Sequence, residues 1–145
     1  MLTNKGKYGL KAMVYLAGLG GEAALAVDIA YANDIPKRFL DTILSDLRVA
    51  GLLLSKKGRG GGFALARAAC NITVAEVVRA LDGPLAPILC TSLNYYRRCE
   101  DCEDESSCPV HLIMSQVREK IARVMENRTL ADVYRTSKRA GERAR

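Results

Sequence analysis

Apolar residues near the start of the chain recur at short, regular intervals. This periodicity predicts an amphipathic helix whose apolar face packs against a core. Three lysines precede the apolar stretch 12–19, an order also found in secretory signals, but a signal sequence is disfavoured because the stretch is short and holds a glycine and a tyrosine. The apolar positions of the expected helix are Tyr8, Ala12, Tyr15, Leu16 and Leu19.

Two further helices separated by a tight turn are expected next. The pattern predicts a short helix over residues 27–32, a turn over 33–35 and a longer helix over 36–50, which Pro36 can begin and Gly51 can end. A short helix, a turn and a longer helix with a basic first turn together make a helix-turn-helix motif. The apolar face expected on the longer helix comprises Phe39, Leu40, Ile43, Leu44 and Leu47.

Residues 52–65 consist of two apolar stretches around a glycine-rich, basic turn, which is typical of a β-hairpin. A hairpin directly after a helix-turn-helix acts as a wing, whose tip can reach a minor groove. A phosphate-binding loop is disfavoured because no G-K-[ST] follows the glycines. We therefore predict a mainly α-helical winged helix-turn-helix DNA-binding domain over residues 1–84. The expected DNA contacts are Lys37, Arg38, Thr42 and Ser45 on the longer helix and Lys56, Lys57 and Arg59 on the wing.

A second apolar pattern begins after the predicted DNA-binding domain. Residues 109–127 predict a long helix whose apolar positions repeat as in a coiled-coil seam. Such a helix either packs on its own domain or, as we expect, joins two copies in a homodimer, because an extended helix needs a partner for its stripe. We assign a dimerisation helix and C-terminal segment to residues 109–134 and a basic, frayed tail to 135–145. The seam comprises Val110, Met114, Val117, Ile121 and Val124.

The length and the net charge are typical of a small nucleic-acid-binding protein with a single domain. The 145 residues have 22 Lys and Arg against 16 Asp and Glu, and this net charge of +6 favours an anionic partner. Positive charge concentrates in residues 1–67, whereas residues 100–105 are acidic. No apolar run approaches the roughly 18 residues of a membrane span, so we expect a cytoplasmic protein that has no membrane partner.

Cysteines cluster in the segment 85–108, which we call the cysteine loop and expect to be a sensor. The odd total of 5 cysteines argues against a disulfide framework. Thiolates and imidazole suit an iron–sulfur cluster or zinc, and residue chemistry alone leaves both open, with free thiols as a third reading. The candidate ligands are Cys90, Cys99, Cys102, Cys108 and the chain's single histidine, His111.

Two cysteine assignments lie outside this metal-binding hypothesis. Cys99 and Cys102 could form the dithiol of a small thiol-redox enzyme, but acidic neighbours should raise the thiol pKa, opposite to what such an enzyme needs. We therefore predict that the protein is not an enzyme. Cys70 is distant from the loop in sequence and is expected to be a small packed residue.

Four segments carry a likeness to a known family: residues 2–10, 35–44, 58–66 and 81–84. They resemble the Rrf family, second class, of bacterial winged-helix transcriptional regulators, and the likeness covers nearly the whole chain. The resemblance implies homodimers that bind palindromic operators in double-stranded DNA, with the long C-terminal helix crossing to the partner.

The resemblance also bears on the cysteine loop. Cluster-binding members carry three cysteines before the long helix, the last two separated by five residues, as Cys102 and Cys108 are here. Cys90 falls at the first cysteine position, and His111 matches the C-x2-H of one branch. The resemblance thus implies operator binding controlled by a [2Fe–2S] or [4Fe–4S] cluster on these four residues, with Cys99 as a substitute ligand, in response to iron, redox state or nitric oxide. Other members bind no cluster, so a zinc or free-thiol loop that senses a small molecule or partner protein is the alternative.

Overall fold

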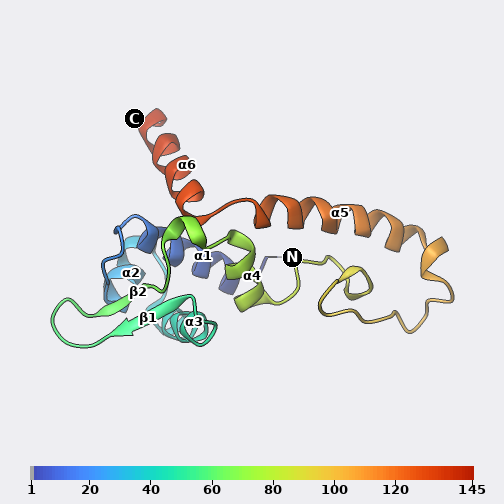
Figure 1. Cartoon of the computed structure of the whole chain (residues 1–145), viewed down its shortest axis with the longest axis horizontal. Coiled ribbons are helices and arrows are strands. Elements are labelled where there is room, and N and C mark those ends of the chain that lie inside the picture. The colour runs from blue at the N-terminus through green and yellow to red at the C-terminus, as the bar shows by residue number, and fades with distance from the viewer. Residues whose placement is uncertain (1) are drawn as a thin grey trace.

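A computed structural model describes residues 2–145 and shows a helical body from which one long helix projects (Figure 1). This mainly α-helical fold with one antiparallel hairpin confirms the predicted fold class. No helix within residues 2–145 combines the length and hydropathy needed to cross a bilayer. The helices are α1 (Asn4–Ala17), α2 (Ala26–Asn33), α3 (Lys37–Val49), α4 (Val74–Asp82), α5 (Pro109–Glu126) and α6 (Leu130–Arg143); the strands are β1 (Leu53–Lys56) and β2 (Gly62–Leu65); and the short 3₁₀ turns are η1 (Ala69–Asn71), η2 (Leu89–Thr91) and η3 (Glu105–Ser107).

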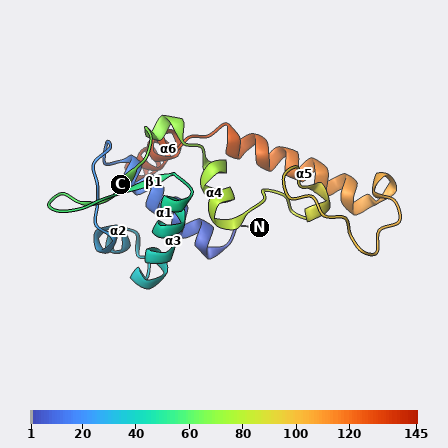
Figure 2. The same ribbon diagram turned by 60° about the horizontal axis from the view of Figure 1, so that its bottom comes forward.

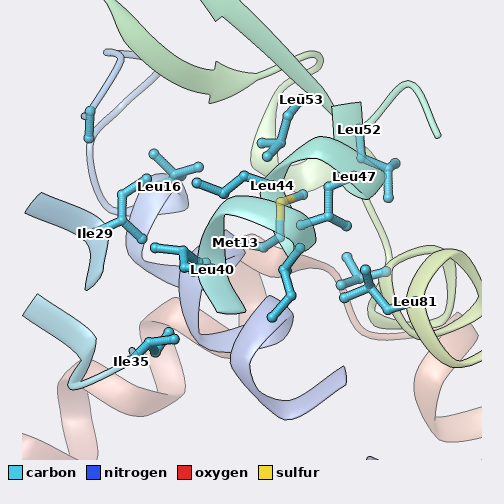
Figure 3. Packing of buried hydrophobic residues seen from close by; sticks show 14 of the residues in the cluster. Met13, Leu16, Ile29, Ile35, Leu40, Leu44, Leu47, Leu52, Leu53 and Leu81 are labelled. Carbon is cyan, nitrogen blue, oxygen red and sulfur yellow. The ribbon is translucent and has the colours of Figure 1, made fainter. Parts of the chain in front are cut away.

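The core of the body forms where α1 packs against α3 and α4. The hydroxyl of Thr3 caps α1 by accepting a hydrogen bond from the amide of Gly6. Thr3 also donates to the carboxylate of Asp82 through its amide, at 2.9 Å, and its hydroxyl, at 2.5 Å, which ties the start of α1 to the end of α4. The apolar stretch that resembles a signal is therefore part of the packed core. The core, shown in Figure 3, includes Met13 and Leu16 of this stretch together with Leu40, Leu44, Leu47, Leu53 and Leu81.

The helix-turn-helix motif is formed by α2 and α3. Asp34 ends α2 in the left-handed conformation, with φ 52 and ψ 51, and the amide of Ile35 then bonds the carbonyl of Ala30 at 3.0 Å. Buried Ile35 anchors the turn, and Pro36 takes the N-cap position, so that α3 begins one residue later than the sequence predicts.

The hairpin is anchored to the segment between α1 and α2. β1 and β2 pair with Leu53 opposite Leu65, and the backbones of Ala24 and Phe63 form an isolated bridge beside them. Gly62 makes this bridge possible, because a Cβ at that position would lie 2.2 Å from the carbonyl oxygen of Ala24.

The chain returns to the body after α5. Thr73 and Thr129 form an isolated bridge, and the amide of Leu130 donates to the carbonyl of Ile72 at 2.9 Å. Leu130 is fully buried in the core, and α6 packs against α1. The frayed tail predicted for residues 135–145 is wrong, because α6 continues to Arg143. The prediction of a frayed end did not take account of the capping box that starts α6 or of the packing of α6 against α1.

The projecting helix α5 differs from the α-helices of the body. It has 18 residues and none of them is buried. It contacts α4, η2 and η3, and the cysteine loop runs beside it (Figure 2). An ion pair between Arg79 and Glu126, at 2.5 Å, fastens its C-terminal end to α4. Two of the predicted seam residues are exposed, Val110 by 53% and Val124 by 62%, whereas the remaining three are half-buried.

Candidate DNA-binding surface and cysteine loop

The exposed face of α3 carries the predicted recognition residues. Leu40, Ile43, Leu44 and Leu47 are buried on one side of the helix, so the polar residues occupy the other. Each of the four predicted contacts on this helix is solvent-exposed: Lys37, Arg38, Thr42 and Ser45.

Phe39 does not belong to the apolar face of α3 that the sequence predicts. Its side chain is 52% exposed, and the guanidinium of Arg38 lies over its ring at 5.2 Å from the centroid. Phe39 directly precedes Leu40 and points about 100° away from it around the helix, and the core on the Leu40 side is already filled by Leu40, Ile43 and Leu44. The cation–π contact orients the Arg38 side chain on the surface.

Lys37 has a carboxylate partner that the sequence reading overlooked. Its ammonium nitrogen lies 3.0 Å from one carboxylate oxygen of Asp41, one helical turn away. The spacing of four residues between a cation and an anion was the available signal. Asp41 therefore neutralises part of the positive charge at the start of α3.

The wing presents its basic residues to solvent. Lys56 ends β1 opposite Gly62, and the turn closes through a hydrogen bond of 3.0 Å from the amide of Gly61 to the carbonyl of Gly58. The side chains of Lys56, Lys57 and Arg59 are exposed, and within residues 2–145 none of them has a carboxylate within 4.0 Å.

Two predicted metal ligands lie together where the cysteine loop meets α5. Cys90 is in η2 and only 7% exposed, and its sulfur lies 3.4 Å from Nδ1 of His111 in the first turn of α5. These residues are 21 positions apart in sequence. Their contact joins the start of the loop to the projecting helix.

The other thiols lie around this pair without completing a coordination geometry. Cys108 is the N-cap of α5 and makes no capping hydrogen bond through its side chain. Cys102 is half-buried and Cys99 is exposed. In the part of the chain from residue 2 onward, no three metal-binding side chains converge on one point.

Burial and neighbouring charge act on two of these thiols. Burial raises the pKa of Cys90, and Cys99, Glu105 and Cys108 raise it further. Burial also raises the pKa of Cys102, with Cys108, Cys99 and Glu105 adding to the effect. The direction predicted for Cys102 is thus correct, although burial outweighs the acidic residues as its cause. Both thiols hold their protons more firmly than a free cysteine.

A polar scaffold that the sequence analysis missed shapes the loop. Arg98 donates to the carbonyls of Cys102 and Glu103, at 2.8 Å each. The hydroxyl of Tyr96 donates to the carboxylate of Glu105 at 2.5 Å. Because an arginine and a tyrosine in an irregular segment have no periodic signal, only their contacts reveal this role.

The donor set of the loop fits a thiolate-ligated centre. Sulfur and imidazole donors are those that iron–sulfur clusters and zinc take in proteins, and Cys90 and His111 are already in contact. Cys70 takes no part in this set. It is exposed, contrary to the packed position predicted for it, because η1 turns its side chain toward Asn71 at the surface.

Comparisons with known proteins assign the chain to a family. The sequence profile of the Rrf2 family, described as an iron-dependent transcriptional regulator, matches residues 2–136. The chain belongs to the Rrf2 family. An rrf2-like HTH-type transcriptional regulator of Rhodobacter capsulatus is 39% identical over 137 residues, which cover 92% of this chain and 91% of the relative.

Solved structures of Rrf2-family regulators share this fold. CymR, the global cysteine regulator of B. subtilis, aligns with a TM-score of 0.77 at 28% identity, covering 94% of this chain and 97% of that one. IscR of T. potens aligns with a TM-score of 0.77 at 26% identity, covering 97% and 90%. This Rrf2 protein is thus a winged-helix transcriptional regulator rather than an enzyme, and the thiol-redox hypothesis for Cys99 and Cys102 is rejected.

Proposed function

We propose that this Rrf2 regulator binds a palindromic operator as a homodimer and that an iron–sulfur centre in the cysteine loop controls its affinity. The ligands are Cys90, Cys102, Cys108 and His111, with Cys99 as the substitute. The contact of 3.4 Å between Cys90 and His111 is the observation that carries the proposal, because it joins a thiol and an imidazole that come from separate elements.

The DNA-binding half of the proposal rests on two exposed surfaces of the body. The first turn of α3, with Lys37 and Arg38, enters the major groove, and Thr42 and Ser45 follow along the same face. Arg59 at the wing tip reaches the neighbouring minor groove, while the two wing lysines contact phosphates. Because Lys37 is paired with Asp41, its attraction to the DNA is partly offset by that carboxylate.

The homodimer is supported by the unpartnered face of α5. Val110, Ile113 and Val124 are about half exposed or more and lie along one edge of a helix that buries none of its residues. A second copy of α5 packed on this edge would remove these side chains from water.

The cysteine loop is placed to influence the body through α5. When bound, the centre supplies an iron site that responds to iron supply, oxidants or nitric oxide. Cys90 and His111 hold the N-terminal end of α5, and Arg79 with Glu126 holds the other end against α4. Asp82, which ends α4, bonds Thr3 at the start of α1. A change in the residues that ligate the centre is thereby linked to the positions of α1 and α4, the two helices against which α3 packs.

Anaerobic purification of the full chain tests the proposal. We expect a coloured protein with visible absorbance, and iron and sulfide in comparable amounts. Its dissociation constant for a duplex selected from a random-sequence library should differ by about tenfold or more from that of the protein stripped of metal, a difference of about 1.4 kcal/mol.

The matched variants are Cys90→Ser and Cys70→Ser, which remove one thiol inside and one outside the loop. We expect the first to lose the visible absorbance and the second to keep it. A colourless preparation containing zinc would instead support the zinc-loop alternative. Equal duplex affinity with and without the centre would disprove the coupling, and no salt-dependent duplex binding at all would disprove the DNA-binding assignment.

A further inference from the structure

The last helix carries a row of arginines that the proposed function does not use. Arg135, Arg139 and Arg143 lie four residues apart on α6 and are exposed. A spacing of four residues keeps them on one face, spread over about 12 Å at about 1.5 Å per residue. The C-terminal region from residue 128 has two acidic residues, Asp132 and Glu142, against Arg128, Arg135, Lys138, Arg139, Arg143 and Arg145.

Folding of α6 does not account for this row. Like charges four residues apart destabilise a helix by about 0.2–0.5 kcal/mol per pair. Arg135 is paired with Asp132 at 2.5 Å, but within residues 2–145 neither Arg139 nor Arg143 has a carboxylate within 4.0 Å. Only Arg143, in the last turn, gains from the helix dipole. The mutual repulsion favours an external anion as the partner of the row.

The row lies on the opposite side of the body from the recognition helix. α6 packs against α1, and α1 in turn packs against α3, so α1 separates the two surfaces. Both views show α6 at one edge of the body and α3 toward the other (Figures 1 and 2). A straight duplex held by α3 cannot reach the arginines of the same body.

We propose that the arginine row of α6 binds the phosphate backbone of a second DNA duplex while α3 holds the first. This inference rests on the proposed operator binding. A DNA strand carries one negative charge about every 3.4 Å of helix axis, so a row about 12 Å long spans several phosphates. Small side chains, those of Thr136 and Ala140, lie beside Arg139 and Arg143 along a shallow groove and leave the backbone room to approach.

The outward face of α6 fits a nucleic acid better than a membrane or a protein. A helix that lies in a membrane surface needs a free apolar face. The apolar residues of α6 instead face the body, where Leu130 is buried and Tyr134 is half-buried. Protein interfaces are anchored by aromatic or aliphatic side chains at their centre, and the groove beside the arginines offers no apolar side chain larger than alanine.

A two-duplex capture experiment tests the inference. The full chain is bound to an immobilised duplex selected from a random-sequence library, which is kept in excess so that every α3 is occupied. A labelled duplex of scrambled sequence is then added. We expect capture that falls steeply with salt, and loss of most of it in Arg139→Ala/Arg143→Ala. The slope of log affinity against log salt should decrease by about 2 in that variant.

Two controls isolate the charge of the row. Arg139→Lys/Arg143→Lys keeps the charge and should keep capture, and Arg97→Ala/Arg123→Ala removes two exposed charges elsewhere and should also keep it. Unchanged capture in Arg139→Ala/Arg143→Ala overturns the inference, as does binding to phosphatidylserine vesicles in place of the second duplex. If the chain binds the immobilised duplex normally but does not capture the labelled duplex, only this inference is overturned. If the chain fails to bind the immobilised duplex, the proposed function is overturned.

Discussion

The body and the projecting arm of this protein are stabilised in different ways. The body encloses a continuous core to which α1, α3, α4, the hairpin and Leu130 of α6 all contribute. The arm, consisting of α5 and the cysteine loop, buries Cys90, Thr91 and Ser92 but not one residue of its helix. The body therefore folds around its own apolar contacts, whereas the arm leaves apolar side chains such as Ile113 and Val124 exposed to solvent.

This difference suits a regulator. A rigid body keeps α3 and the wing in a fixed relation, since the hairpin is bonded to Ala24 and α3 is buried along four residues. The arm is joined to the body by the packing of α5 against α4, the Arg79–Glu126 ion pair, the Thr73–Thr129 bridge and the chain itself. Because no residue of α5 belongs to the core, a local event in the loop can alter the arm without unfolding the body.

The largest expected effect comes from removing a core side chain of the body. Leu44 is fully buried, so Leu44→Ala should cost about 2–5 kcal/mol of unfolding free energy through lost burial and a residual cavity. Chemical denaturation followed by circular dichroism measures it. The same truncation in the arm, Ile113→Ala at a residue 49% exposed, should change the unfolding of the body by less than about 1 kcal/mol. Equal losses would erase the distinction between the two regions.

An intermediate effect is expected for a charge on the exposed edge of α5. Val124→Asp would place an unpaired carboxylate in the proposed dimer interface, which should weaken dimerisation by about tenfold or more. Sedimentation equilibrium measures the dissociation constant. Gln116→Asp introduces the same charge on a solvent-facing part of the helix and should leave the dimer intact. If both variants dimerise like the original chain, the partner of α5 is not a second α5.

The smallest effect is expected at the cap of α4, on the body side of the junction. Thr73 and Glu76 form a capping box, and Thr73→Ala should cost about 1 kcal/mol. Burial opposes ionisation of Glu76, but hydrogen bonds from Thr73 and Arg67 outweigh it and lower the pKa of the carboxyl.

This lowered pKa gives the cap a predictable pH dependence. Because the pKa of Glu76 is lower in the folded chain, its stabilising contribution is present above the ordinary glutamate pKa of about 4.3 and is lost as the pH falls through the folded value. The loss of stability on acidification should therefore be smaller in Glu76→Gln than in the original chain. Denaturation curves on both sides of that pH measure this difference, and identical acid sensitivity would contradict the role of the carboxylate.

The sequence was most informative where local patterns and packing agree. Apolar periodicity predicted α1 and α3, and the order of helix, turn, helix and glycine-rich hairpin predicted the winged helix. The apolar periodicity wrongly assigned Phe39 to the buried face of α3. An apolar residue at the margin of a helical face can be buried or exposed, and the packing of its neighbours decides which. The basic composition of residues 135–145 suggested a frayed end. The capping box at Thr129 and the burial of Leu130 in the core instead stabilise a helix that includes most of these residues.

The candidate cysteine site could be predicted by composition but not by arrangement. The clustering of thiols and the single histidine identified the candidate ligands. It could not show that Cys90 meets His111 while Cys99 is exposed, nor that Arg98 and Tyr96 shape the loop. Such contacts join residues in irregular segments, for which spacing along the chain carries little information about distance in space.

The amino-acid sequence by itself determined the family, the winged-helix order of elements and the chemical types of the groups that can bind DNA and metal. These follow from local rules, because periodicity, turn residues and side-chain chemistry act over a few positions. Only the tertiary structure decided that Leu130 is buried in the core, that Asp41 pairs with Lys37, and that α6, with its exposed arginines, packs against α1. The reason is physical: burial and electrostatic pairing depend on which surfaces the folded chain brings into contact.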